Sequence, residues 1–139
     1  MKIENENLLI REFPSHLKNV EQVDQFIEWV KGKFELSDQK IFDIHIALTE
    51  AVNNAMIHGN YLNDEKTVIL SVIRLGDTLR FTIKDEGKGF KLTDCNDPTA
   101  KEFIDKPNGR GIYLIQHLAD RVTFLEKGRV VEIDFKICS

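Results

Sequence analysis

Residues 50–60 read Glu-Ala-Val-Asn-Asn-Ala-Met-Ile-His-Gly-Asn and form the second half of an expected helix. We expect this helix to begin at Ser37, a good N-cap, and to end at Gly59, a common helix stop. Apolar side chains cover most of its circumference, which is typical of a buried helix. The polar side chains of Glu50 and Asn54 are exceptions to that pattern and indicate a candidate site.

Glu50 and Asn54 are four positions apart in the sequence, so their side chains project side by side from the helix. A carboxylate can take a proton from a hydroxyl group or from water. An amide oxygen is a hard ligand that suits Mg²⁺, which binds phosphates directly. The pair predicts either a catalytic and metal-binding site or, more simply, a solvated strip on the helix surface.

Along the rest of the chain the expected strands follow one another in hairpins, and the expected helices lie in separate segments. This order favours an α+β fold. After Pro14, with Ser15 as the expected N-cap, apolar residues recur at helical spacing as far as Phe34. The other expected elements are strands at residues 8–13, 67–75, 78–84, 122–127 and 130–137, and a helix at residues 111–120. We expect a single domain over residues 1–139, built as a two-layer α/β sandwich. Its mostly antiparallel mixed sheet would carry the helices on one face.

The strand expected at residues 78–84 leads into Asp85-Glu86-Gly87-Lys88-Gly89-Phe90. Strand alternation places Asp85 on the apolar side of that strand. A buried carboxylate is costly unless a donor satisfies it, and the amino group of adenine is one such donor. Gly87 and Gly89 allow the backbone to approach a ligand closely. The alternative is a simple turn in which Asp85 is hydrogen-bonded within the protein.

A second glycine segment, Pro107-Asn108-Gly109-Arg110-Gly111, runs directly into the helix expected from Gly111. Glycines before a helix N-terminus place free N–H groups around an anion. Arg110 either adds positive charge there or points to solvent, and the segment is otherwise a flexible loop. Neither the P-loop signature nor the dinucleotide fingerprint occurs in this segment.

Composition narrows the class of partner. The chain has 139 residues and a formal net charge of −4, which disfavours nucleic acid and anionic membranes. We expect Cys95 and Cys138 to be free thiols, because neither belongs to a ligand cluster. Neither a signal-peptide core nor an apolar run of membrane-spanning length is present, so we expect a cytoplasmic protein without a membrane partner.

The three motifs occur in a telling order: a helical Glu-x-x-x-Asn, a strand ending in Asp-x-Gly-x-Gly, and a Gly-x-Gly that opens a helix. In this order they resemble the N, G1 and G2 boxes of the Bergerat, or GHKL, ATP-binding superfamily. The resemblance covers nearly the whole chain. The first motif, with His58 and Gly59 after it, is most similar to the anti-sigma factor serine kinases of bacterial partner-switching systems.

The resemblance implies a Bergerat ATP-binding fold with ATP and Mg²⁺ as cofactors. It implies that Glu50 is the general base, that Asn54 holds Mg²⁺ beside the ATP, and that Asp85 binds the adenine amino group. The stretch from Thr93 to Asn108 would be a mobile lid. The other residues that it places around ATP are His58, Gly87, Gly89, Phe90, Asn108, Gly109, Arg110, Gly111, Ile112 and Arg129.

Arg129 departs from the family pattern. The family often has Gly-Thr in the last hairpin, with the threonine near the adenine, whereas this chain has Gly128-Arg129. Strand parity predicts that Arg129 points to the same side as Val131. An arginine there would alter the contacts with the base or weaken ATP binding.

In the branch that the chain resembles, the phosphate acceptor is a serine of an anti-sigma factor antagonist, and the second partner is a sigma factor. The resemblance therefore implies an ATP-dependent protein serine kinase that also sequesters a sigma factor. Two alternatives stay open, a non-catalytic ATP-binding regulatory module and the catalytic domain of a sensor histidine kinase. A homodimer is plausible from the resemblance alone.

Overall fold

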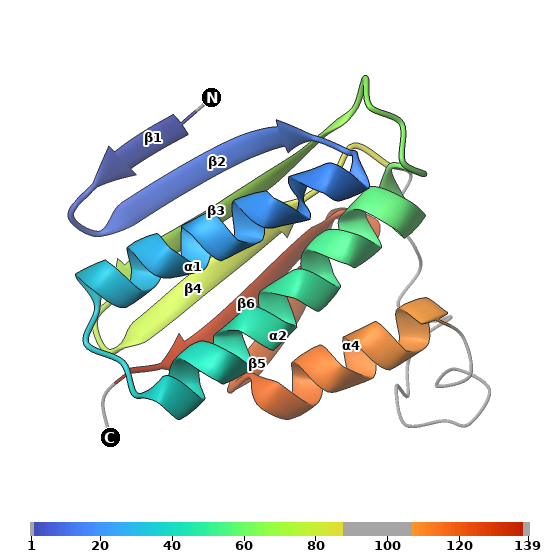
Figure 1. The fold of residues 1–139 in the computed structure, drawn as a ribbon. Helices are drawn as coiled ribbons and strands as arrows, with labels where there is room; N and C mark the ends of the chain where they lie inside the picture. The colour runs from blue at the N-terminus through green and yellow to red at the C-terminus, as the bar shows by residue number, and fades with distance from the viewer. Residues whose placement is uncertain (1, 88–106, 138–139) are drawn as a thin grey trace.

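The computed structural model describes residues 2–87 and 107–137, which form two layers (Figure 1). Within these residues the sheet has six strands in the order β1-β2-β3-β4-β6-β5, and its helices lie on one face. Every pair of neighbouring strands is antiparallel. The expected α+β sandwich is confirmed, although no parallel pair occurs among the described strands and the sheet is therefore not mixed.

The strands and helices have the following bounds. The strands are β1 (Lys2–Asn5), β2 (Leu8–Pro14), β3 (Thr67–Leu75), β4 (Thr78–Lys84), β5 (Arg121–Leu125) and β6 (Val130–Lys136). The helical elements are η1 (Leu17–Val20), α1 (Glu21–Lys33), α2 (Asp38–Asn54), η2 (Ala55–Gly59), α4 (Pro107–Leu118) and η4 (Glu126–Gly128).

The core lies between the sheet and the helices, as the alternation along β4 predicts. Leu79, Phe81 and Ile83 are buried on the helix-facing side of this strand. The ring of Phe26 on α1 packs edge-on against Phe81, with 6.3 Å between the ring centroids. Burial of each such side chain contributes about 1.5–3 kcal/mol to folding. Because Asp85 follows Ile83 by two positions, the same alternation carries its side chain to the inner face.

Helix α2 begins as expected and ends with a widened turn. The side-chain oxygen of Ser37 accepts a hydrogen bond of 3.1 Å from the backbone N–H of Lys40, which confirms the N-cap. After Asn54 the chain continues as the π-helix η2, which ends at Gly59. Short π-helical turns are common at functional sites, because they rotate the side chains that follow.

Two features near the N-terminus differ from the expectation. Ser15 is buried and does not cap a helix; His16 caps η1 instead, because its Nδ1 accepts a 3.1 Å hydrogen bond from the N–H of Lys18. Helix α1 therefore begins only at Glu21. Strand β1 was not expected, because its short polar sequence has little alternation, and it forms by pairing along β2.

Helix α4 begins earlier than expected, at Pro107 instead of Gly111. Proline suits the first position of a helix, because its missing N–H has no partner there in any case. Asn108, Gly109 and Arg110 consequently lie within the first turns of the helix and not in a preceding loop. The predictions for Gly89, Phe90, Cys95, Cys138 and most of the lid fall outside the described residues.

Candidate functional site

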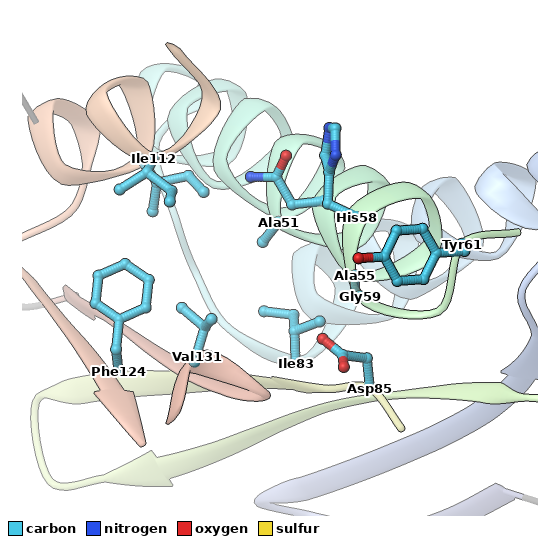
Figure 2. A pocket seen from close by; sticks show the side chains of 13 residues that line it. Ala51, Ala55, His58, Gly59, Tyr61, Ile83, Asp85, Ile112, Phe124 and Val131 are labelled. Atoms are coloured by element: carbon cyan, nitrogen blue, oxygen red, sulfur yellow. The ribbon is translucent and has the colours of Figure 1, made fainter. Parts of the chain in front are cut away.

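A cavity of about 240 Å³ lies between the end of α2, the end of β4, and α4 (Figure 2). Its walls are largely apolar, and its polar groups lie towards two ends. The residues that line it are Ala51, Asn54, Ala55, His58, Gly59, Tyr61, Ile83, Asp85, Ile112, Ile115, Phe124, Gly128 and Val131. An apolar cleft with a few convergent polar groups is the usual form of a small-molecule site.

Asp85 forms the polar group at one end, and its side chain rises from the end of β4 towards the end of α2 (Figure 2). It is only 7% exposed. Its Oδ1 accepts a 2.7 Å hydrogen bond from the N–H of Gly87, and its own N–H donates to the carbonyl oxygen of Arg129 at 2.9 Å. Within the described residues no hydrogen bond to Oδ2 is found, so this oxygen can accept one from a ligand.

The ionisation of Asp85 reflects this environment. Burial raises the pKa of the carboxyl group above its ordinary value of 3.8, because the charged form is poorly solvated. The hydrogen bond from Gly87 lowers the pKa in part, as do the positive charges of Arg129 and Lys66. A carboxylate held in this way benefits from an additional donor, such as the amino group of a nucleobase.

Two glycines allow the backbone at the end of η2 to cross the segment after β4 in close contact. A Cβ atom on Gly59 would overlap the carboxylate of Asp85, and one on Gly87 would overlap the backbone carbonyl of Gly59. The sequence predicted close approach of Gly87 to a ligand. The structure shows that Gly87 approaches the protein's own backbone at Gly59 and thereby helps to fix the position of Asp85; its approach to a ligand stays a prediction.

Glu50 and Asn54 lie at the other end of the site, against α4. A Cβ atom on Gly111 would be 2.9 Å from Nδ2 of Asn54 and 3.1 Å from Oε2 of Glu50. Both side chains are half-buried, so they do not form a solvated strip. Asn54 lines the cavity, whereas Glu50 is not among the lining residues. The structure thus brings the first and third motifs into contact, although they are far apart in the sequence.

The available donors and acceptors fit an adenine nucleotide with Mg²⁺. An apolar cavity ends in a carboxylate that can accept from an amino group, and the opposite end has an amide beside the start of α4. No cluster of three or more His, Cys, Asp or Glu side chains that could hold a metal occurs in the described ranges. Asn54 offers an amide oxygen to a metal ion, and Mg²⁺ uses few protein ligands and completes its shell with phosphate and water.

The remaining predicted residues are distributed around this cavity. His58 is exposed at the mouth of the cavity and Ile112 is a buried wall residue on α4. Asn108, Gly109 and Arg110 are placed by their backbone in the first turns of α4, close to the Gly111 that contacts Asn54.

The strand geometry expected for Arg129 is not found. Glu126, Lys127 and Gly128 all have left-handed φ values, of 48°, 60° and 87°. Arg129 therefore precedes β6 with helical backbone angles, and strand parity does not apply to it. Its Nε donates to the carbonyl oxygen of Glu126 at 3.3 Å, and Arg129 is not among the residues that line the cavity. Its charge nevertheless acts on Asp85, as the direction of the pKa effect shows.

Several cavity residues were not predicted from the sequence. Tyr61 lies at the mouth beside His58, with a left-handed φ of 52°, and Phe124 and Val131 form the wall on the β5–β6 side (Figure 2). Tyr61 follows directly after the first motif, so an aromatic residue just past a helix stop was the available signal. Phe124 and Val131 had been assigned only to strands.

Comparison with known proteins places the chain among nucleotide-binding domains. Residues 13–135 match the family described as histidine kinase-like ATPase domain. The chain is 35% identical over 101 residues to the anti-sigma F factor of Anoxybacillus flavithermus, a match that covers 68% of each protein.

Two further relatives carry the same name. The anti-sigma F factor of Bacillus cytotoxicus is 33% identical over 90 residues, which are 63% of this chain and 61% of that protein. The anti-sigma F factor of Bacillus thuringiensis is 34% identical over 87 residues, which are 60% of this chain and 59% of that protein. The matched region thus spans about 60% of the length of these two relatives.

Within the part of the chain that the structure describes, none of the helices has the length and apolar character required to cross a bilayer. The family match covers most of the chain, and it includes all the residues that line the cavity. The chain therefore belongs to the histidine kinase-like ATPase domain family.

Proposed function

We propose that this protein is an anti-sigma factor and an ATP-dependent protein serine kinase. It phosphorylates a serine of an anti-sigma factor antagonist, and it sequesters a sigma factor. The observation that carries the proposal is that Asp85 and Asn54 line the same apolar cavity, with Glu50 beside Asn54 against α4. The relatives named anti-sigma F factor support the choice of partners.

Binding of ATP in this proposal begins with the base. Oδ2 of Asp85 accepts a hydrogen bond from the adenine amino group, while the ring lies against apolar walls that include Ile83 and Ile112. His58 and Tyr61 border the base at the mouth of the cavity. The apolar walls favour a planar heterocycle, and the carboxylate fixes its orientation.

The phosphates lie at the α4 end. Backbone N–H groups in the first turn of α4, at Asn108 and Gly109, bind phosphate oxygens, because the start of a helix attracts anions. Asn54 would hold Mg²⁺ together with the phosphates, and the bound ion would neutralise phosphate charge. Gly89 and Phe90 would complete the base pocket.

Glu50 acts as the general base in the transfer. Its carboxylate takes the proton from the serine hydroxyl while the serine oxygen forms a bond to the γ-phosphorus of ATP. The bond from that phosphorus to the bridging oxygen breaks, and ADP leaves with the electron pair. Most of the acceleration in such reactions comes from positioning and charge neutralisation, and a general base adds about 10²–10⁴-fold.

Phosphotransfer to a candidate antagonist protein tests the proposal. Wild-type protein and Glu50→Ala are mixed with Mg·ATP and the antagonist, and phosphoserine is quantified by mass spectrometry. We expect a rate loss of about 10²–10⁴-fold for Glu50→Ala with ATP affinity largely retained. The matched control is Glu28→Ala, an exposed glutamate on α1 that does not line the cavity.

Absence of phosphoserine with wild-type protein, or equal rates for wild-type protein and Glu50→Ala, would contradict the kinase. Nucleotide-dependent binding of partners without turnover would then support the non-catalytic module. Phosphohistidine on a partner would support the sensor-kinase alternative. Sigma-factor binding is measured separately by titration, with and without ATP, and failure to bind would contradict the anti-sigma role.

A further inference from the structure

Asn60 is a buried polar residue next to the cavity, to which neither the motifs nor the family match assigns a role. It follows Gly59 directly, it is 1% exposed, and it does not line the cavity. Its Nδ2 donates to Oγ of Ser15 at 2.6 Å and to the carbonyl oxygen of Thr67 at 2.9 Å. Its Oδ1 accepts from the N–H of Glu86 at 2.8 Å.

The hydrogen bond from the Glu86 N–H to Asn60 matters because of the position of Glu86. Glu86 stands between Asp85 and Gly87, the two residues that Gly59 contacts at the backbone crossing. The bond from Glu86 to Asn60 therefore lies at the crossing itself, one residue away from the carboxylate that faces the cavity. Any shift of this bond moves Asp85 relative to the end of η2.

Hydrogen bonds of Thr67 to both Asn60 and Glu86 complete a ring of three residues. Its N–H donates to Oε2 of Glu86 at 2.6 Å, while its carbonyl oxygen accepts from Asn60. Glu86 is thus held through both its backbone and its side chain by residues that are themselves bonded to each other. Asn60 is the buried member of this ring, and its amide donors and its oxygen are all paired. A buried polar group that is fully hydrogen-bonded rigidifies the structure around it.

We propose that Asn60 is a positioning residue that holds Asp85 in register with the cavity and thereby sets selectivity for nucleobases with an amino group. The inference rests on the proposed function, because it takes Asp85 as the group that contacts the base. It concerns the discrimination between bases and leaves the phosphotransfer step unchanged.

The amide of asparagine is chemically suited to this place. It must donate to Thr67 and Ser15 and accept from Glu86 at the same time, which a carboxylate or an aliphatic side chain cannot do. In Asn60→Asp the side chain keeps its shape, but a carboxylate oxygen faces the carbonyl oxygen of Thr67. Repulsion between these two acceptors would displace the ring and with it Asp85.

The experiment compares ATP with inosine triphosphate, whose base carries a carbonyl oxygen in place of the amino group. Dissociation constants for both are measured by calorimetry with the full chain. For wild-type protein we expect ATP to bind at least about tenfold more tightly, because the inosine carbonyl meets the Asp85 carboxylate. In Asn60→Asp we expect the ATP constant to rise about tenfold and the inosine triphosphate constant to change less than about threefold.

Two control variants separate positioning from a general loss of structure. Ser15→Ala removes one bond of Asn60 on the side remote from Glu86, so it should lower thermal stability and keep the preference for ATP. Asn63→Ala removes an exposed asparagine from the same turn, with the 3.0 Å hydrogen bond that it accepts from the N–H of Glu65, and should keep the preference for ATP. Circular dichroism establishes that each variant is folded, and Asn60→Ala provides a second substitution if Asn60→Asp does not fold.

The outcomes distinguish a failure of the Asn60 role from a failure of the proposed function. A folded Asn60 variant that retains the wild-type preference for ATP, or that weakens both nucleotides equally, overturns the positioning role. A wild-type protein that binds ATP without preferring it over inosine triphosphate overturns the assignment of Asp85 to the base, and the role of Asn60 with it. Absence of ATP binding by wild-type protein overturns the proposed function itself.

Discussion

Asp85 at one end of the cavity is enclosed by backbone, whereas Asn54 and Glu50 at the other end contact α4 through the ends of their side chains. A Cβ on Gly87 would overlap the carbonyl of Gly59, whereas the three nearest neighbours of a Cβ on Gly111 are side-chain atoms of Asn54 and Glu50. The first end is therefore rigid before any ligand arrives, and the second can adjust. This difference suits a site that recognises a base by shape and holds phosphates by adaptable polar groups.

Gly87→Ala should produce the largest effect, because the backbone at the rigid end cannot move aside. We expect the free energy of unfolding to fall by about 1–3 kcal/mol, as for other overpacked sites. ATP affinity should fall by about 100-fold or more, since this clash displaces Asp85. Urea denaturation and calorimetry measure the two quantities.

Gly32→Ala is the matched control for this substitution, because a Cβ on Gly32 meets no atom within 4 Å. In a helix this change should raise stability by up to about 1 kcal/mol and leave ATP affinity unchanged. A Gly87→Ala protein that remains as stable and as tightly binding as wild type would show that the crossing is not rigid.

Asp85→Asn should weaken ATP binding and at the same time raise the free energy of unfolding. Loss of a hydrogen bond to a charged group costs about 1.5–3 kcal/mol, so ATP affinity should fall by about 10–100-fold. Stability at pH 7 should rise, because the buried charge disappears while the acceptor for the Gly87 N–H is retained. Weaker nucleotide binding together with lower stability would argue that Asp85 serves only the fold.

The pH dependence of the same variant sharpens this prediction. Burial raises the pKa of Asp85 above 3.8, so the folded protein binds this proton more tightly than the unfolded chain does. Wild type therefore loses stability as pH rises from below 3.8 to above the raised pKa. The advantage of Asp85→Asn should appear over that interval and vanish at lower pH, which denaturation at a series of pH values measures. An advantage that does not change with pH would refute the raised pKa.

Gly111→Ala tests the adaptable end and should have a smaller effect. The gain in helix propensity of about 1 kcal/mol offsets part of the contact with Asn54 and Glu50, so stability should change by less than about 1 kcal/mol. ATP affinity should fall by roughly tenfold, because Asn54 is pushed away from its place in the cavity. Destabilisation as large as that of Gly87→Ala would show that the end at Asn54 and Glu50 is as rigid as the end at Asp85.

Arg129→Ala should have the smallest effect, a change of a few-fold in ATP affinity at neutral pH, as expected for one partly exposed charge. The Arg129 charge lowers the pKa of Asp85, so its removal should shift the pH at which ATP binding weakens to a higher value. Arg129→Lys keeps the charge and should leave that profile in place. Equal profiles for both variants and wild type would remove Arg129 from the site.

The sequence predicted the features that depend on residues close together in the chain. Apolar spacing and the Ser37 cap predicted the helix that carries Glu50 and Asn54, and strand alternation predicted that Asp85 faces inward. Residues whose conformation depends on distant contacts were missed. Asn60 bonds Ser15, which is 45 positions away, and β1 exists only through pairing with β2.

The predictions for Arg129 and for the start of α4 differ from the structure for another reason. In each case two local sequence signals conflict, and the wrong one was followed. Strand alternation applies to Arg129 only if the residues before it are extended, and their left-handed φ values are not visible in a strand pattern. The glycines after Pro107 predict a loop, whereas the proline begins a helix that continues through them. Roles for Gly89, Phe90 and the lid stay predictions.

A structure of the protein bound to a non-hydrolysable ATP analogue and Mg²⁺ would show directly where the base and the phosphates lie. We expect the adenine ring to lie in the cavity, with its amino nitrogen about 2.7–3.2 Å from Oδ2 of Asp85. The triphosphate should extend towards Asn54 and the start of α4. A nucleotide bound elsewhere, or a base that points its amino group away from Asp85, would contradict this expectation.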